Sequence, residues 1–255
     1  GWRFINPIMK EKYGTDSMPE TAENVAEKYQ ISRDDQDRFA LKSQEKALQA
    51  ISNGRMNKEI TFVVAKQKRG DDLHVDKDEH PRETSNEKLS KLPTPFKKNG
   101  TVTAGNSSGV NDGAATLIIA DKKAIKVHNL KPLARIICAA SSGVEPSYMG
   151  IGPVTATQKV LKKSNLSIDN IDILEINEAF AAQVLACLKE FGISFNDDRV
   201  NPNGGAIALG HPLGMSGTRL VLTAAKELEI TNKKYALCTM CVGVGQGSAI
   251  ILEKV

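Results

Sequence analysis

Residues 171–192 read IDILEINEAFAAQVLACLKEFG, a run in which a short apolar stretch passes directly into a helical pattern. Residues 171–176 have the length and apolar content of a buried strand. The polar side chains of Asn177 and Glu178 follow at once, at the end of a predicted strand, where α/β folds bind their ligands. By propensity alone, Asn177 would instead be a helix cap. The stretch therefore predicts an α/β fold with a candidate site at this strand–helix junction.

The second half of the chain repeats this alternation. Apolar runs of strand length occupy residues 115–120, 134–140, 171–176 and 235–242. Helical patterns lie between them, over residues 153–163, 179–191 and 215–229. Strands that alternate with helices are typical of α/β layered domains. We therefore expect residues from about 130 to 255 to form a mixed sheet with helices on both faces.

The first part of the chain is polar, and its clearest predicted element is a helix. Ser32 and Asp35 form a capping signal, and Asn53 with Gly54 forms a stop. Apolar residues recur at helical spacing between these signals, which predicts a helix of about five turns. Residues 59–64 predict a short strand. Residues 66–95 are charged and interrupted by proline, so we expect an extended excursion over the surface.

The composition of the chain indicates a globular protein and disfavours membrane and nucleic-acid-binding classes. The chain has 255 residues, of which 40% are hydrophobic and 25% charged, as in ordinary globular domains. It holds no apolar run of 18 residues and no signal-peptide pattern, which predicts a cytoplasmic protein without a membrane partner. The net charge of +4 is dispersed, so we expect no nucleic-acid partner, whereas a polyanionic small ligand is compatible. The four cysteines stand in apolar stretches, which favours a reducing compartment.

A second motif surrounds His211. Residues 201–214 read NPNGGAIALGHPLG and precede a predicted helix. This density of glycine predicts turns with positive φ and a close approach of the backbone to its surroundings. A lone histidine is more often structural than catalytic, but a glycine-lined turn before a helix suits an imidazole that is held beside a substrate.

A third motif lies near the C-terminus, where residues 238–247 read CTMCVGVGQG. Cys241 ends an apolar strand, and the glycines after it leave backbone N–H groups unshielded, as an oxyanion hole requires. The Cys-x-x-Cys spacing also allows a metal or redox pair. However, strand alternation turns Cys238 and Cys241 to opposite faces, and no second cysteine pair exists. A dinucleotide loop is disfavoured because the glycines lead into another strand.

Together and in this order, the three motifs resemble those of the thiolase family, the acetyl-CoA acyltransferases. Residues 103–114, TAGNSSGVNDGA, are similar to the segment of that family that lines coenzyme A. The resemblance covers the whole chain, which corresponds to the C-terminal two-thirds of a thiolase. Residues 1–7, 16–24 and 199–203, which read GWRFINP, DSMPETAEN and RVNPN, are similar to the 3-oxoadipyl-CoA thiolases of aromatic catabolism.

The resemblance implies a thiolase-like layered αβα fold. Residues 1–98 would form the loop region that covers substrate and coenzyme A, residues 99–128 the last part of the N-terminal half, and residues 129–255 the complete C-terminal half. The first half would be mostly missing. The nucleophilic cysteine of the family would lie in that missing part, so that this chain alone would be inactive.

The resemblance also assigns roles to residues. His211 would activate the nucleophilic cysteine, and Cys241 would move the proton at the α-carbon of acetyl-CoA. Asn177 would hold a water in the oxyanion site shared with His211, and the N–H of Gly243 would serve the other oxyanion site. Coenzyme A and the acyl chain would be lined by Met18, Arg82, Leu92, Phe96, Ala104, Ser108, Met149, Ala179 and Phe180.

The implied reaction is the thiolysis of a 3-oxoacyl-CoA through a cysteine acyl-enzyme. The expected form is 3-oxoadipyl-CoA plus coenzyme A giving succinyl-CoA and acetyl-CoA. Two alternatives are a general fatty-acid or acetoacetyl-CoA thiolase and a non-catalytic fragment that binds coenzyme A. Coenzyme A would act as a substrate, with no covalently bound cofactor and no metal, and the whole enzyme would be a homodimer or homotetramer.

Overall fold

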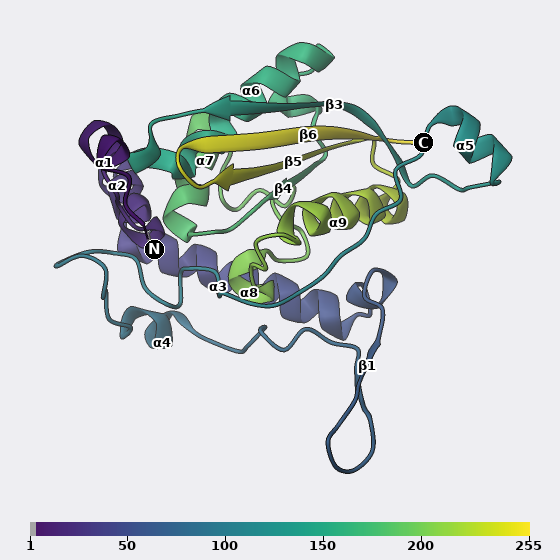
Figure 1. Ribbon diagram of the computed structural model, residues 1–255, viewed down its shortest axis with the longest axis horizontal. Helices are drawn as coiled ribbons and strands as arrows, with labels where there is room; N and C mark the ends of the chain where they lie inside the picture. The colour runs from purple at the N-terminus through teal and green to yellow at the C-terminus, as the bar shows by residue number, and fades with distance from the viewer. Residues whose placement is uncertain (1–3) are drawn as a thin grey trace.

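The computed structural model describes residues 4–255 (Figure 1). The first three residues of the GWRFINP stretch therefore lie outside the described residues. The first half of the chain forms α1 (Pro7–Tyr13), α2 (Met18–Tyr29), α3 (Arg33–Ser52), η1 (Met56–Lys58), β1 (Val63–Ala65), β2 (Leu73–Val75), α4 (Asn86–Ser90) and α5 (Lys122–Val127). The second half forms β3 (Ala134–Gly143), η2 (Pro146–Ile151), α6 (Gly152–Ser164), η3 (Ile168–Asn170), β4 (Ile173–Ile176), α7 (Ala181–Phe191), α8 (Ala206–Leu209), α9 (Ser216–Thr231), β5 (Tyr235–Val242) and β6 (Gln246–Lys254).

The second half is built on a mixed sheet with the strand order β3-β6-β5-β4. Strands β4 and β5 are parallel, and the other two neighbouring pairs are antiparallel. Leu174 and Ile176 pack with residues of α6 and α7, whereas Ile173 packs with residues of α9. Since adjacent residues of a strand point to opposite faces, helices cover both faces of the sheet, as predicted (Figure 1).

Helix α7 lies at the centre of the larger core cluster. Every residue from Ala181 to Leu188 is buried, which a helix reaches only when other elements surround it. Its neighbours include α2, α3, α6 and the η2 turn. The helix begins two residues later than predicted, because Phe180 forms a β-bridge with Ser107 and stays extended.

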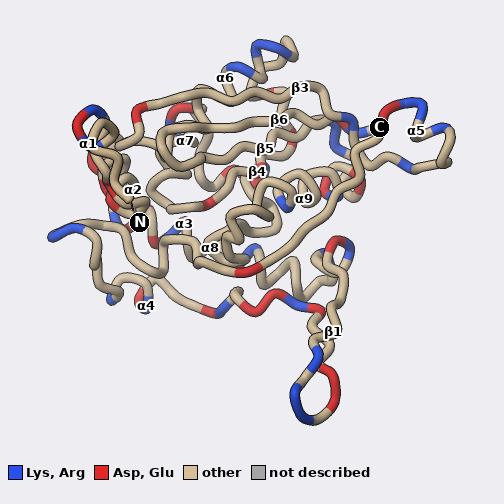
Figure 2. Tube along the Cα trace, in the orientation of Figure 1, with Lys and Arg blue, Asp and Glu red and all other residues tan. Residues whose placement is uncertain are grey.

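The predicted helix of the first half is confirmed as α3. Ser32 is its N-cap, with Oγ accepting the N–H of Asp35, and Asn53 is its C-cap. The short strand predicted at residues 59–64 is only partly right, since β1 begins at Val63 and pairs with β2. This hairpin projects from the body of the protein, and its tip carries residues of both charges (Figures 1 and 2).

The strand predicted at residues 115–120 is wrong. The segment is extended but pairs with no described strand, and Ile118 and Ile119 are 81% and 70% exposed. An apolar run alone does not make a β-strand, because the backbone also needs a neighbouring strand for its hydrogen bonds. None of the helices within residues 4–255 combines the length and the apolar character needed to cross a bilayer.

Candidate active site

The candidate site lies at the carboxyl ends of the parallel strands β4 and β5. Ile176 pairs with Thr239, so both strands end at the same edge of the sheet. The N–H of Asn177 donates to the carbonyl of Thr239 over 2.9 Å, and Cys241 follows two residues later on β5. The register of two adjacent strands thus brings two of the three predicted motifs together.

Asn177 links this edge to the motif around His211. Its Nδ2 atom lies 3.3 Å from Nε2 of His211. The side chain is fully buried, and its Oδ1 atom has no hydrogen-bond partner among the described residues. An unpartnered buried carbonyl oxygen is unusual and suits a group that holds a water or a ligand.

A tight turn between α8 and α9 carries His211. Gly210, at the C-terminus of α8, has φ of 92°, and a Cβ there would lie 2.5 Å from Oδ1 of Asn111. The same Oδ1 accepts the N–H of His211 over 3.2 Å. Asn111 thus fixes the backbone of the histidine. Sequence reasoning did not single it out, although it belongs to the 103–114 stretch.

The imidazole of His211 is partly buried and contacts Asn177 and Ser216. Its Nδ1 atom lies 2.6 Å from Oγ of Ser216. Burial lowers the pKa of His211 below its ordinary value, and the nearby guanidinium of Arg219 lowers that pKa further. The ring is therefore neutral at neutral pH and can accept a proton.

Glu178 also contacts this turn; the sequence placed it at the candidate strand–helix junction but assigned it no role. Its carboxylate accepts hydrogen bonds from Oγ of Ser43, Nδ2 of Asn201 and the N–H of Ile207, the second residue of α8. A Cβ on Gly205 would lie 2.3 Å from its Cδ, so glycine is required for this close approach. Burial raises the pKa of Glu178, and these hydrogen bonds offset part of the rise.

Cys241 occupies an apolar setting. It packs with Ala22, Val102, Met149, Ala179 and Phe180. Burial raises the pKa of its thiol to about 12, so the thiol is protonated at neutral pH. Cys238 packs instead against α9 on the other face, as strand alternation predicted.

Gly243 stands in the tight turn that joins β5 to β6. The turn places Val244 at φ of 64°, which is unusual for a β-branched residue. A Cβ on Gly243 would lie 3.9 Å from Sδ of Met18, the first residue of α2. The turn therefore lies close to Met18 from the first half of the chain.

The structure gathers some of the predicted coenzyme A residues and leaves others apart. Met149, Ala179 and Phe180 share a cluster with Cys241, and the N–H of Ser108 donates to the carbonyl of Ala179 over 3.0 Å.

The other four residues that were predicted to line coenzyme A do not pack with Cys241. Ala104 and Phe96 are exposed, and Leu92 packs near Gly105. Arg82 is also exposed, and its N–H donates to Oε1 of Gln44. Residues 4–255 contain no group of three or more His, Cys, Asp or Glu side chains that could hold a metal ion.

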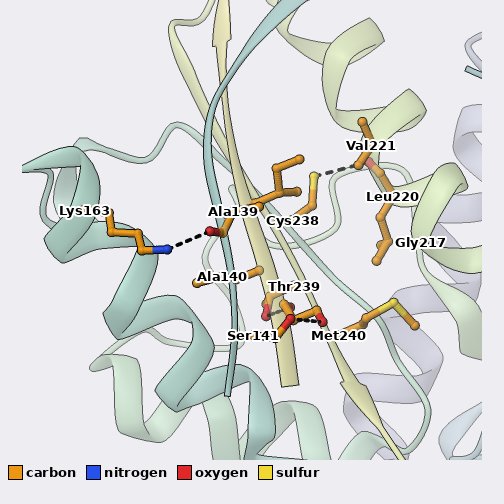
Figure 3. Close-up of a pocket in the computed structure, with 13 residues that line it drawn as sticks. Ala139, Ala140, Ser141, Lys163, Gly217, Leu220, Val221, Cys238, Thr239 and Met240 are labelled. Atoms are coloured by element: carbon orange, nitrogen blue, oxygen red, sulfur yellow. Dashed lines mark hydrogen bonds between the residues drawn. The ribbon is translucent and has the colours of Figure 1, made fainter. Parts of the chain in front are cut away.

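A separate hollow of about 550 Å³ lies on the sheet face that α9 covers only in part (Figure 3). Its floor includes Cys238, Met240, Ser248 and Ile250, and α9 contributes one wall. The hollow includes none of the predicted catalytic residues, and it shows that part of this sheet face is uncovered in the described chain.

Family models match nearly the whole chain. The model of the thiolase N-terminal domain matches residues 4–123, and that of the thiolase C-terminal domain matches residues 130–254. The chain is 58% identical to the 3-oxoadipyl-CoA/3-oxo-5,6-dehydrosuberyl-CoA thiolase of Escherichia coli K12, over the full chain and 64% of that relative. It is 48% identical to an acetyl-CoA acetyltransferase of Syntrophomonas wolfei, over 91% of the chain and 59% of the relative.

Solved structures agree with these matches. The acetyl-CoA acetyltransferase of Bacillus anthracis superposes with a TM-score of 0.92 at 40% identity, covering 100% of this chain and 66% of that one. Human mitochondrial 3-ketoacyl-CoA thiolase in complex with CoA gives a TM-score of 0.89 at 47% identity, covering 93% of this chain and 59% of that one. The chain thus spans less than two-thirds of the length of these proteins.

Proposed function

The chain belongs to the thiolase family, and on this premise we propose that it carries the acid–base part of an acyltransferase that cleaves 3-oxoacyl-CoA thioesters with coenzyme A. The contact between Asn177 and a neutral His211, at the strand ends that also carry Cys241, is the observation on which the proposal rests. Thiolysis needs a base for a nucleophile, a second group for the α-carbon proton, and donors for two oxyanions.

His211 is proposed as the base that accepts a thiol proton. The thiol would belong to a cysteine outside these 255 residues. Cys187 is fully buried in α7 and donates to Gly150, whereas Cys238 donates to Leu220 on the far face. Within residues 4–255, no cysteine sulfur is hydrogen-bonded to His211.

Cys241 is proposed to transfer the proton at the α-carbon of the acetyl-CoA product. A thiol with a pKa of about 12 is protonated at rest and suits the acid that protonates the departing enolate. The unpartnered Oδ1 of Asn177 supports the proposed oxyanion water. The half-buried position of Gly243 in the turn after β5 supports a second oxyanion site. Cleavage forms the new thioester at the former ketone carbon, and the other fragment leaves as acetyl-CoA.

The proposed substrate is 3-oxoadipyl-CoA, which would give succinyl-CoA and acetyl-CoA. Support comes from relatives named beta-ketoadipyl-CoA thiolase, which are 54–58% identical over the whole chain. Coenzyme A is proposed to pass Met149, Ala179 and Phe180, which pack with Cys241, and Ser108, whose N–H donates to the carbonyl of Ala179. Homo-oligomeric assembly, a role in aromatic catabolism and a cytoplasmic location stay predictions from the resemblance.

The test joins this chain to the segment of the Escherichia coli relative that it does not span. The fusion should consume 3-oxoadipyl-CoA faster than acetoacetyl-CoA when coenzyme A is added, measured as loss of the Mg²⁺-enolate absorbance. Changing His211 to Ala in the fusion should lower kcat on the order of 10²-fold or more.

Two controls accompany this assay. The 255-residue chain alone should show no turnover, and turnover by it would place the nucleophile at one of its own cysteines. A fusion that binds coenzyme A but turns over neither substrate would favour the non-catalytic alternative. A preference for acetoacetyl-CoA would favour a general thiolase.

A further inference from the structure

We infer that Ser216 is a positioning residue that fixes the tautomer of His211, so that Nδ1 carries the proton and Nε2 presents a lone pair towards Asn177. Ser216 is the first residue of α9 and is only 2% exposed. Its catalytic consequence rests on the proposed function, whereas the tautomer itself does not.

The hydrogen bonds of Ser216 indicate which nitrogen of His211 is protonated. Its Oγ lies 3.0 Å from the carbonyl oxygen of Pro212 and 2.6 Å from Nδ1 of His211. A carbonyl oxygen can only accept, so the single hydroxyl proton is directed to Pro212. The Oγ atom then accepts from the ring, which requires a proton on Nδ1.

The contact of Nε2, on the other side of the ring, agrees with this assignment. A neutral imidazole has one N–H, so Nε2 must be unprotonated when Nδ1 is protonated. Nε2 lies 3.3 Å from Nδ2 of Asn177, which is a donor. With the proton on Nδ1, all three hydrogen bonds are satisfied: Ser216 to Pro212, His211 to Ser216, and Asn177 to His211.

The competing assignment satisfies fewer contacts. If Ser216 donated to Nδ1, the ring would be protonated at Nε2 and would need an acceptor from Asn177. The amide would then have to present Oδ1, and the hydrogen bond from Ser216 to Pro212 would be lost. Pro212 is a fixed acceptor, because the N–H groups of Met215 and Ser216 also donate to it as α9 begins.

The tautomer decides what the imidazole can do first. A lone pair on Nε2 accepts the thiol proton directly, and the resulting imidazolium then donates from Nε2 to an oxyanion while Nδ1 keeps its bond to Ser216. The opposite tautomer could not accept a proton at the atom that faces Asn177. Ser216 acts through His211 and touches no reacting atom.

The decisive measurement is long-range ¹H–¹⁵N NMR of the ¹⁵N-histidine-labelled 255-residue chain, at a pH where His211 is neutral. His80 provides an internal standard, because its Nδ1 lies 2.9 Å from the carbonyl oxygen of Ala208 and must be protonated when neutral. We expect His211 to show the same pattern as His80. A protonated Nε2 on His211 would overturn the inference. The spectrum of a His211→Gln variant assigns the signal.

Two variants complete the test. In Ser216→Ala the population should shift towards protonated Nε2. Ser142→Ala, which removes another buried hydroxyl that is hydrogen-bonded to Thr155 and not to the ring, should change nothing. An unchanged His80 signal shows that the fold persists. A Ser216→Ala spectrum in which Nδ1 remains fully protonated would also refute the inference.

Kinetics of the fusion protein test the catalytic consequence. Ser216→Ala should lower kcat by about 10- to 100-fold, because general-base catalysis depends on the correct protonation state. The KM for coenzyme A should stay unchanged, because the side chain of Ser216 is hydrogen-bonded to His211 and Pro212 and to none of the proposed coenzyme A residues. An inactive fusion with the expected spectrum would reject the proposed function alone. An active fusion unaffected by Ser216→Ala would reject the positioning role.

Discussion

Replacing Glu175 with Gln is expected to remove a pH dependence from the stability of this chain. Glu175 lies on β4 with no exposed surface, and its Oε2 is 3.0 Å from Nη1 of Arg219. Its Oε1 has no hydrogen-bond partner among the described residues. Burial raises the pKa of Glu175 from 4.5 to about 7, although Arg219 lowers that pKa in part.

The sign and size of the effect follow from these pKa values. Between pH 4.5 and pH 7 the folded state holds a proton on Glu175 that the unfolded state has lost, so the free energy of unfolding decreases as pH rises. The stabilisation is fully present below pH 4.5 and is lost as pH passes about 7. At 1.36 kcal/mol per pKa unit, the loss is on the order of 3 kcal/mol.

The assay is urea unfolding followed by far-ultraviolet circular dichroism at several pH values from about 5 to 8. Between these limits the wild-type chain should lose about 2.5 kcal/mol more unfolding free energy than the Glu175→Gln variant. Glu178 is present in both proteins and its charge raises the pKa of Glu175, so the difference between the two pH curves includes this interaction. Glu87→Gln, at an exposed position, is the control. Parallel pH curves for wild type and Glu175→Gln would refute the reasoning.

Three further outcomes are expected. Gly205→Ala should destabilise the chain by about 1–3 kcal/mol because its Cβ would meet Glu178, whereas Gly214→Ala, with open space around it, should stay within about 0.5 kcal/mol in urea unfolding. Leu188→Ala in buried α7 should cost about 2–5 kcal/mol, while Leu213→Ala at an exposed position should be nearly neutral by the same measurement. The thiols of the folded chain should react with a disulfide reagent far more slowly than in urea, since burial raises the pKa of each cysteine, and equal rates would contradict this.

Secondary-structure elements were predicted correctly where interactions between residues close in sequence determine them. The cap at Ser32 and the stop at Asn53 set the ends of α3 through hydrogen bonds within a few residues. The apolar runs at β3, β4 and β5 predicted strands because continuous apolar stretches of strand length are typical of buried strands. The same reasoning failed at residues 115–120, where pairing depends on a partner strand that periodicity does not reveal.

The sequence by itself determined the three motifs and their order, and it placed the motifs of Asn177 and Cys241 at the ends of strands and that of His211 before a helix. It could not determine what surrounds each side chain, because contacts between residues far apart in the chain arise only on folding. Asn111 lies 100 residues before His211 but fixes its backbone, and Ser43 lies 135 residues before the carboxylate of Glu178 that it contacts. Tertiary structure alone decided that Cys241 is enclosed by apolar side chains, and this burial raises the pKa of its thiol.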